Sequence, residues 1–244
     1  MAGYSEDLAY IHDAGFGNFA RGAAPALLKT FRAHGIRGGL VVDAGCGSGI
    51  WAQALIAAGY DALGIDISPS MIRLARRKAP GAKFRTASLL SVRLPACAAV
   101  TAIGECVNYA FDSSNSRHRL VAFFGRVFDA LLPGGMFIFD FAEPGQIQDG
   151  TRRRKHMLGP DWAVLLDARE NKSRRILVRE IVSFRKVGNC YRRTEESHKL
   201  RLFDRAELER ELRRIGFRTR LFRRYGTMPL RAGTVGIEAI KPKG

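Results

Sequence analysis

An aspartate and three glycines lie close together in the stretch VVDAGCGSGI, which covers residues 41–50. The apolar residues before Asp43 predict a buried strand. Glycine then takes every second position, at Gly45, Gly47 and Gly49. A backbone without side chains can approach a ligand closely at the turn between a strand and a helix. We therefore expect a ligand at this turn.

The glycine spacing separates two classes of ligand. A dinucleotide fingerprint requires the pattern GxGxxG, but Ile50 stands where its third glycine belongs. The observed spacing, GxGxG, suits a ligand with a compact charged part and no diphosphate. The residues therefore favour such a ligand over a nicotinamide dinucleotide.

Strand and helix patterns alternate around these residues. The predicted strands cover residues 40–43, 62–66, 83–87, 97–103 and 136–141. The predicted helices cover residues 18–34, 49–58, 70–78 and 116–131. Such alternation is typical of the α/β class and predicts a doubly wound, mainly parallel sheet.

The pattern changes after the fifth predicted strand. Apolar and polar residues alternate with period two at 162–169, 176–185 and 191–203, which predicts a three-stranded antiparallel insert. Asp204 and Glu207 form a capping box that opens a helix. The last predicted strands cover residues 217–225 and 234–241.

Positive charge is concentrated in the C-terminal part of the sequence, and the formal net charge is +17. Residues 1–140 contain 14 basic and 10 acidic residues, whereas residues 141–244 contain 26 and 13. One interpretation is a surface for nucleic acid or for an anionic substrate. The other is an arginine-rich composition spread over solvated faces. The basic residues are dispersed except at 152–155, which favours the second interpretation.

The cysteines and the apolar runs bear on the cellular compartment. Cys46, Cys97, Cys106 and Cys190 show neither a CxxC pair nor the spacing of a zinc site, so we expect free thiols and no metal. No apolar run approaches the roughly 18 residues of a membrane span. The first ten residues lack the pattern of a secretory signal. We therefore expect a cytoplasmic protein without a membrane partner.

The glycine stretch DAGCGSG resembles motif I of the class I S-adenosylmethionine-dependent methyltransferases, whose usual form is close to DxGCGxG. GIDIS, which contains Asp66, and LLPGGMFIFDF are similar to family segments at the corresponding places. The resemblance covers residues 38–142 closely and 200–244 less closely. It implies a Rossmann-like fold with a seven-stranded, mainly parallel sheet. It also implies S-adenosylmethionine as cofactor and S-adenosylhomocysteine as product.

The resemblance further implies which residues contact the cofactor. In the family, the acid at the position of Asp66 accepts hydrogen bonds from the ribose hydroxyls. Ser88 stands where the family often has an aspartate against the adenine, and the Leu89 N–H stays available beside it. The implied contacts are Asp43, Gly45, Cys46, Gly47, Gly49, Trp51, Asp66, Ile67, Ser88, Leu89, Gly104, Glu105 and Asn108.

Small-molecule members of the family suggest further site residues. They often hold the methionine carboxylate with an arginine about twenty residues before the motif I acid, and Arg21 fits that place with a fork suited to a carboxylate. Tyr10 would lie over the cofactor as part of a lid. The segment after the fourth strand faces the acceptor in the family. We therefore expect Glu105, Tyr109 or a residue of the insert to act as general base if the acceptor must lose a proton.

These observations predict three parts of the chain. Residues 1–37 form an N-terminal lid and helix, residues 38–149 and 204–244 form the cofactor-binding core, and residues 150–203 form a β-rich insert on the substrate side. An insert in this place resembles that of small-molecule N- and O-methyltransferases. We expect in-line methyl transfer to a small acceptor by a monomer or homodimer, and the basic insert favours an acidic acceptor.

Three alternatives stay open. The basic C-terminal part fits a nucleic-acid methyltransferase, although GECVNYAFD stands where an NPPY-type sequence would be expected. A nicotinamide-dependent oxidoreductase is disfavoured by Ile50. A non-catalytic S-adenosylmethionine-binding protein would need the same residues, because methyl transfer requires few side chains.

Overall fold

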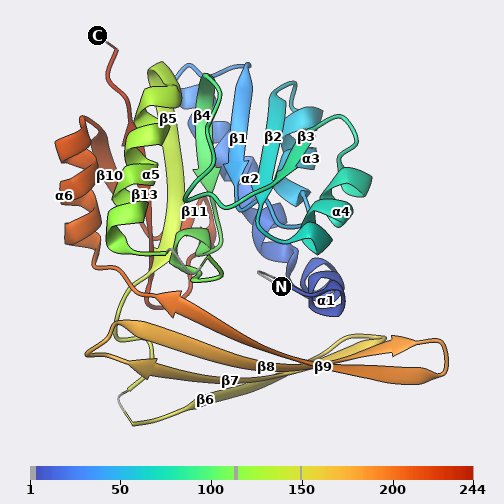
Figure 1. Ribbon diagram of the computed structural model, residues 1–244. Coiled ribbons are helices and arrows are strands. Elements are labelled where there is room, and N and C mark those ends of the chain that lie inside the picture. The colour runs from blue at the N-terminus through green and yellow to red at the C-terminus, as the bar shows by residue number, and fades with distance from the viewer. Residues whose placement is uncertain (1–3, 113–114, 149, 244) are drawn as a thin grey trace.

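The computed structural model describes residues 4–112, 115–148 and 150–243. Figure 1 shows a large sheet flanked by helices, with a second, separate sheet below it. The large sheet has seven strands in the order β10-β13-β5-β4-β1-β2-β3. Its strands are β1 (Leu40–Ala44), β2 (Asp61–Asp66), β3 (Lys83–Thr86), β4 (Cys97–Ala102), β5 (Leu131–Ala142), β10 (Arg218–Phe222) and β13 (Thr234–Ile240).

The strands from β1 to β5 run parallel, whereas β13 pairs antiparallel with β5 on one side and with β10 on the other. The predicted doubly wound, mainly parallel sheet is therefore confirmed. Each connection between parallel strands returns the chain to the same end of the sheet, and these connections are right-handed. Because the strand order reverses at β1, the helices lie on both faces. These helices are α2 (Asn18–Ala33), α3 (Ile50–Ala57), α4 (Pro69–Lys78), α5 (Arg117–Ala130) and α6 (Arg205–Ile215).

Apolar helix residues bury the two faces of this sheet. On one face, Phe31 of α2 and Trp51 and Leu55 of α3 pack against the sheet. On the other face, Phe123 of α5 and Leu212 of α6 belong to a larger cluster. These fully buried side chains fix the helices, and with them the turns that join helices to strands.

A second sheet forms the insert, with the antiparallel strand order β6-β7-β8-β9. The strands are β6 (Arg153–Leu158), β7 (Trp162–Asn171), β8 (Ile176–Val187) and β9 (Cys190–Arg201). The prediction of three strands was wrong by one. The missed strand, β6, reads RRKHML, and its polar residues show no apolar alternation. Pairing with β7, rather than a pattern of its own, makes it a strand.

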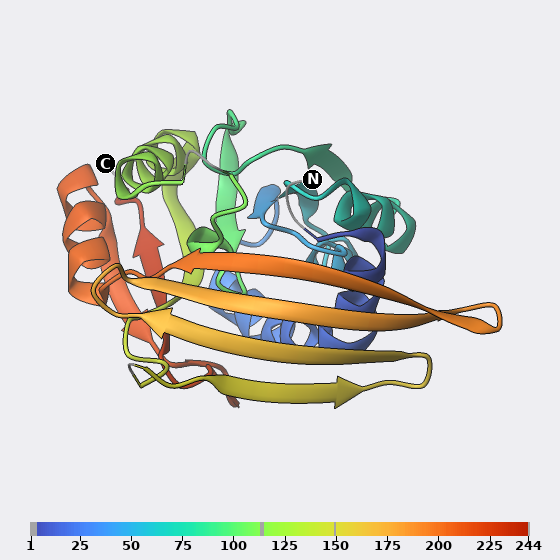
Figure 2. The same ribbon diagram turned by 60° about the horizontal axis from the view of Figure 1, so that its bottom comes forward.

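The insert lies across the carboxyl ends of the parallel strands, at the end where β5 leads into it (Figure 1; Figure 2). Helix α1 (Glu6–Phe16) packs on it through a cluster of Ile11, Trp162 and Val164. Asp7 is buried and pairs with Arg185 at 3.1 Å and with Arg192. The N-terminal segment and the insert are thus joined to each other over the core sheet.

The remaining elements are short. They are the 3-10 helix η1 (Cys106–Asn108) and the strand pair of β11 (Arg224–Tyr225) and β12 (Met228–Pro229). Across the part of the chain that the structure describes, no helix combines the length and apolar character that crossing a membrane requires.

Candidate active site

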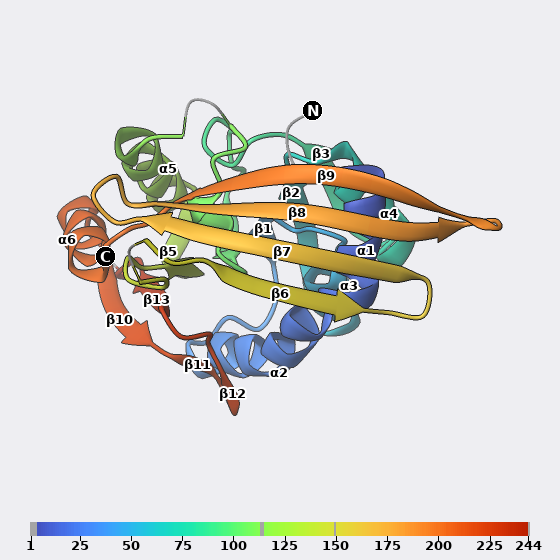
Figure 3. The ribbon, with the colours of Figure 1, turned by 90° about the horizontal axis from the view of Figure 1, so that it is seen from below.

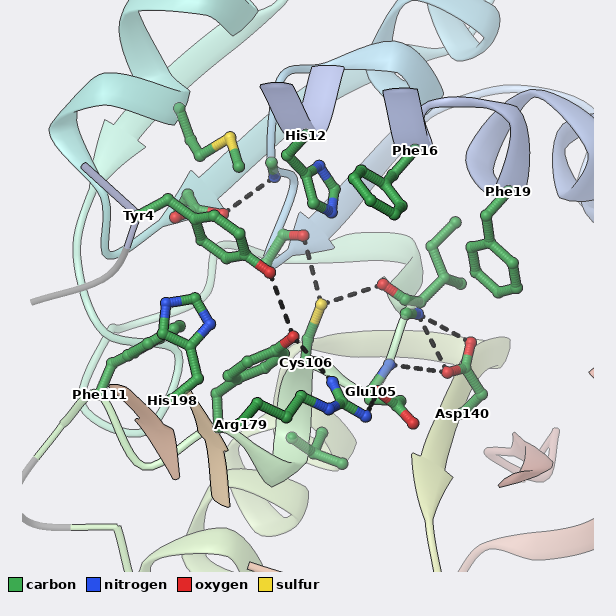
Figure 4. A pocket seen from close by; sticks show the side chains of 18 of the residues that line it. Tyr4, His12, Phe16, Phe19, Glu105, Cys106, Phe111, Asp140, Arg179 and His198 are labelled. Atoms are coloured by element: carbon green, nitrogen blue, oxygen red, sulfur yellow. Dashed lines mark hydrogen bonds and ion pairs between the residues drawn. The ribbon is translucent and has the colours of Figure 1, made fainter. Parts of the chain in front are cut away.

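A cavity of about 470 Å³ lies between the carboxyl ends of the core strands, α1 and the insert. This volume is in the range of small-molecule sites. The glycine loop and the turns after β2 and β3 supply one wall, which we call the cofactor wall. Tyr4, α1, the segment after β4 and the inner face of the insert supply the other, which we call the acceptor wall. Figure 4 shows side chains of both walls around the cavity.

The three glycines of the loop serve different purposes. Gly45 has φ +86°, and a Cβ on it would come within 2.5 Å of the sulfur of Cys106. Gly49 has φ +80°, and a Cβ there would come within 2.9 Å of the backbone of Ala75. A Cβ on Gly47 would meet no atom within 4 Å. Packing therefore requires glycine at the first and third positions, while Gly47 faces open space in the cavity.

Asp66 is held at the end of β2 by backbone donors. One carboxylate oxygen accepts the N–H of Gly47 at 2.9 Å, and the other accepts the N–H of Ser68 at 2.8 Å. Each oxygen keeps a further lone pair, so the carboxylate can still accept two hydrogen bonds from a ligand. Burial raises the pKa of Asp66, although these N–H groups oppose that shift.

Two further carboxylates are buried beside the loop. Asp43 accepts a hydrogen bond from the Thr101 hydroxyl at 3.0 Å, and burial raises its pKa to about 7. Asp140 accepts the hydroxyl of Tyr225 at 2.8 Å and two backbone N–H groups, and burial raises its pKa to about 6. A cationic ligand would stabilise the ionised form of these groups. These carboxylates fit S-adenosylmethionine, which carries a sulfonium and an ammonium group.

The segment after β4 joins the cofactor wall to the insert. Glu105 adopts a left-handed conformation with φ 62°, which is uncommon for a residue with a side chain. Its carboxylate accepts a hydrogen bond from Arg179 of β8 at 2.9 Å, and the two side chains are only 10% and 15% exposed. Arg179 also donates to the hydroxyl of Tyr109 at 3.3 Å. The pair links the core to the inner face of the insert.

Aromatic and imidazole rings form most of the acceptor wall. The hydroxyl of Tyr4 shares a hydrogen bond with that of Tyr109 at 3.1 Å. The ring of Tyr4 also contacts the rings of His12, Phe111 and His198, with centroids 4.9–5.9 Å apart. Burial lowers the pKa of His12 to about 4, so this ring stays neutral at physiological pH. Figure 4 shows His12 and His198 on either side of Tyr4.

His198 is held through one ring nitrogen only. Its Nε2 lies 2.9 Å from Glu196, and Glu196 also accepts hydrogen bonds from Ser5. If Nε2 carries the proton that this contact needs, Nδ1 is left with a lone pair. Nδ1 is buried and has no hydrogen-bond partner among the described residues.

Sequence reasoning did not select several of these residues: Tyr4, His12, Phe16, Phe111, Arg179 and His198. A weak signal existed in β9, where period two places Glu196, His198 and Leu200 on one face. No spacing in the sequence connects that face with α1 or with the segment after β4. Only the packing of the insert over the core brings these segments together.

Most of the predicted site residues line the cavity. They are Asp43, Gly45, Cys46, Gly47, Trp51, Asp66, Ile67, Ser88, Leu89, Gly104, Glu105 and Tyr109. The structure places four others outside the lining. Gly49 is one of these, because it packs on α4. The remaining three are Tyr10, Arg21 and Asn108.

Each of these three side chains has another partner. The hydroxyl of Tyr10 donates to Asp161 at 2.8 Å, so the ring lies at the junction of α1 and the insert. Arg21 is exposed and donates to Asn18, but its guanidinium lies against Gly17, which does line the cavity.

Asn108 clamps both ends of the insert to the core. Its amide donates to the carbonyl oxygens of Ala142 and Arg201 at 3.0 and 2.7 Å, and its carbonyl oxygen accepts the N–H of Ala142. Ala142 ends β5 and Arg201 ends β9, so one fully buried side chain holds the point where the chain leaves the core and the point where it returns.

Residues 41–135 match the family model of a methyltransferase domain. A relative, dTDP-3-amino-3,6-dideoxy-alpha-D-glucopyranose N,N-dimethyltransferase of Streptomyces fradiae, is 26% identical over 226 residues, which cover 88% of this chain and 86% of the relative. The matched domain contains both the glycine loop and Asp66.

Solved structures show the same fold. A S-adenosylmethionine-dependent methyltransferase from Clostridium acetobutylicum ATCC 824 has a TM-score of 0.80 at 16% identity, and the match covers 97% of this chain and 98% of that one. CalS10, an amino pentose methyltransferase from Micromonospora echinaspora whose structure contains S-adenosylmethionine, has a TM-score of 0.75 at 19% identity, with 95% and 96% covered. Residues 41–135 thus match a methyltransferase domain, and nearly the whole chain shares the fold of S-adenosylmethionine-dependent methyltransferases.

Proposed function

We propose that the protein transfers a methyl group to an amino nitrogen of a small-molecule acceptor bound between the two walls of the cavity. Bound S-adenosylmethionine supplies an electrophilic methyl group with a neutral leaving group. The protein mainly has to hold the acceptor nitrogen about 3–3.5 Å from that carbon and exclude water. A cavity enclosed by the glycine loop, α1 and the insert suits this task. That enclosure is the observation that carries the proposal.

Two observations favour nitrogen over oxygen as the methylated atom. The relative from Streptomyces fradiae is named as an N,N-dimethyltransferase of an amino sugar. The acceptor wall also presents aromatic rings and two imidazoles, which suit an ammonium group through its charge and its protons. An ammonium must lose a proton before its nitrogen can attack the methyl carbon. The proton acceptor that we propose is the Nδ1 of His198, which is buried without a hydrogen-bond partner among the described residues.

Glu105 and Tyr109, the bases expected from the sequence, receive different roles in this proposal. The carboxylate of Glu105 is engaged by Arg179, so it positions the segment after β4 rather than accepting a proton. Burial raises the pKa of Tyr109, so its hydroxyl stays protonated and can orient the acceptor by hydrogen bonding. On the cofactor wall, Asp66 would bind the ribose hydroxyls and Ser88 would lie near the adenine. The excess of cations in the insert favours an acidic acceptor.

Calorimetric titration with S-adenosylhomocysteine, with NAD as comparator, tests the cofactor wall. We expect micromolar binding of the first ligand and none of the second. A panel of amines and their hydroxyl analogues, incubated with S-adenosylmethionine, then tests the acceptor wall. Turnover of amines alone supports the proposal. Cofactor binding combined with turnover of hydroxyl analogues, but not of amines, would refute the choice of nitrogen.

A further inference from the structure

The basic run Arg152–Lys155 is divided between the two faces of β6. Arg152 and Arg154 lie 3.1 and 3.3 Å from Asp167 of β7, outside the cavity lining. Arg153 and Lys155, the alternate residues, line the cavity. This division follows from the period of two in a strand, where successive side chains point to opposite faces.

The inner-face cations have no carboxylate opposite them on the neighbouring strand. Arg153 pairs in register with Ala168, and Lys155 with Leu166. Arg153 donates to the backbone carbonyl of Gln146. Among the described residues, neither Arg153 nor Lys155 forms an ion pair, whereas both outer-face arginines share Asp167.

A third cation reaches the cavity from the core. Arg231 follows β12 and lines the cavity, again without an ion pair in the described part of the chain. The charge of Arg231 acts on the acceptor wall. Together with burial, it lowers the pKa of His12. Figure 3 shows β6 as the outer strand of the insert, on the side where the strand pair of β11 and β12 lies.

The cavity is therefore polarised between its walls. Two carboxylates, the buried Asp43 and the half-buried Asp66, lie by the glycine loop. The cations Arg153 and Lys155 enter the cavity from the insert, and Arg231 enters it from the segment after β12. An anion bound in the cavity near these cations would be stabilised by their charge. Arginine and lysine are the side chains that bind phosphoryl and carboxylate groups.

We propose that Arg153, Lys155 and Arg231 form a subsite for an anionic group of the acceptor, either phosphoryl or carboxylate. The proposal rests on the proposed function, since it assigns the anion to the molecule that is methylated. The subsite would hold the acceptor by the end remote from its reacting nitrogen and so direct that nitrogen toward the cofactor wall. All three cations are exposed, so the interaction should weaken as salt rises.

The test uses the full chain saturated with S-adenosylhomocysteine, titrated at low salt with inorganic pyrophosphate and, separately, with malonate. Lys155→Gln and Arg231→Gln each remove one inner cation. Arg152→Gln and Arg154→Gln are matched controls. Each removes one positive charge from the same basic run, but from the side that faces away from the cavity. We expect each inner variant to weaken anion binding by about tenfold to a hundredfold, the usual effect of losing a charged hydrogen bond. The controls should change it by less than about twofold.

The outcomes separate the proposal from its alternatives. Tighter binding of pyrophosphate than of malonate identifies a phosphoryl group, and the reverse order identifies a carboxylate. Equal weakening in the inner and outer variants would show a response to net charge alone and overturn the subsite. Absence of binding by both anions would also overturn it. Binding of S-adenosylhomocysteine is measured first in every variant, so a failure of the cofactor wall is recognised independently of the subsite.

Discussion

The cofactor wall and the acceptor wall are built in different ways. The cofactor wall uses the turns after β1, β2 and β3, which are neighbours in one parallel sheet. Each turn lies within a short stretch of sequence, and the sheet brings the stretches together because carboxyl ends of parallel strands share an edge. The acceptor wall joins segments that are far apart, such as Tyr4 with Tyr109 and Arg179 with Glu105. The residues that we propose for the cofactor are thus encoded in short stretches, whereas those that we propose for the acceptor depend on how the insert packs.

The two walls also differ in charge. Burial raises the pKa values of Asp43 and Asp140 on the cofactor side, which prepares that wall for a cation. On the acceptor side His12 is neutral, and Arg153 and Lys155 have no carboxylate partner among the described residues. Variants that affect one wall and leave the other intact therefore test this difference between the walls.

The largest expected effect comes from the ion pair that joins the walls. Arg179→Ala would leave the carboxylate of Glu105 buried without its cation, which costs about 3–5 kcal/mol in the free energy of unfolding. Denaturant titration measures this loss. Arg152→Ala is the control, since its exposed pair with Asp167 should contribute at most about 1 kcal/mol. If both variants lost the same free energy of unfolding, the buried pair of Arg179 and Glu105 would contribute no more than an exposed pair.

Asp66→Ala should weaken binding of S-adenosylhomocysteine by about 1–3 kcal/mol, because the ligand loses the partner of charged hydrogen bonds. Asp61→Ala, on the same strand but exposed at its other end, serves as the control and should bind normally. Titration calorimetry compares the two variants. Unchanged affinity in Asp66→Ala would remove that carboxylate from the cofactor wall.

The neutral state of His12 predicts a pH dependence of stability. The pKa of His12 is about 4 in the folded protein and about 6.5 when unfolded, so only the unfolded chain takes up this proton between those values. The stability that His12 contributes is complete above pH 6.5 and falls by up to about 1.4 kcal/mol per unit as the pH drops toward 4.

The raised pKa values of Asp43 and Asp140 act in the opposite direction, because their contribution is lost as the pH rises. These groups are common to the wild type and to His12→Phe, so the difference between the two proteins isolates His12. We expect that difference to change between pH 6.5 and 4.5 in denaturant titrations. A difference independent of pH would mean that His12 is solvated and protonates normally.

The smallest effect is a release of protons on cofactor binding. S-adenosylmethionine carries a sulfonium charge that should lower the pKa values of Asp43 and Asp140, so binding near pH 6.5 should release a fraction of a proton. Calorimetry in buffers of different ionisation enthalpy measures this fraction. S-adenosylhomocysteine lacks the sulfonium charge and should release fewer protons. Equal release by both ligands would contradict the link between these carboxylates and the sulfonium.

The parts of the fold that follow from local pattern were predictable. The alternation of strands and helices, the glycine loop and the acid at Asp66 were all read from short stretches. Strand β6 was missed because its residues carry no apolar period, and pairing with β7 supplies its structure. Tyr10 was expected over the cofactor, but a one-dimensional spacing cannot say which face of α1 points into the cavity. That face carries His12 and Phe16 instead.

The sequence by itself determined that this protein has a parallel sheet with a glycine loop and a carboxylate at its carboxyl edge, because those features depend on backbone conformation within a few residues. The composition of the acceptor wall, in contrast, follows only from the tertiary structure. Its rings and charges come from α1, the segment after β4 and the insert, whose mutual placement depends on buried contacts such as those of Asp7 and Asn108. Such contacts join residues with no fixed spacing, so they exist only once the chain has folded.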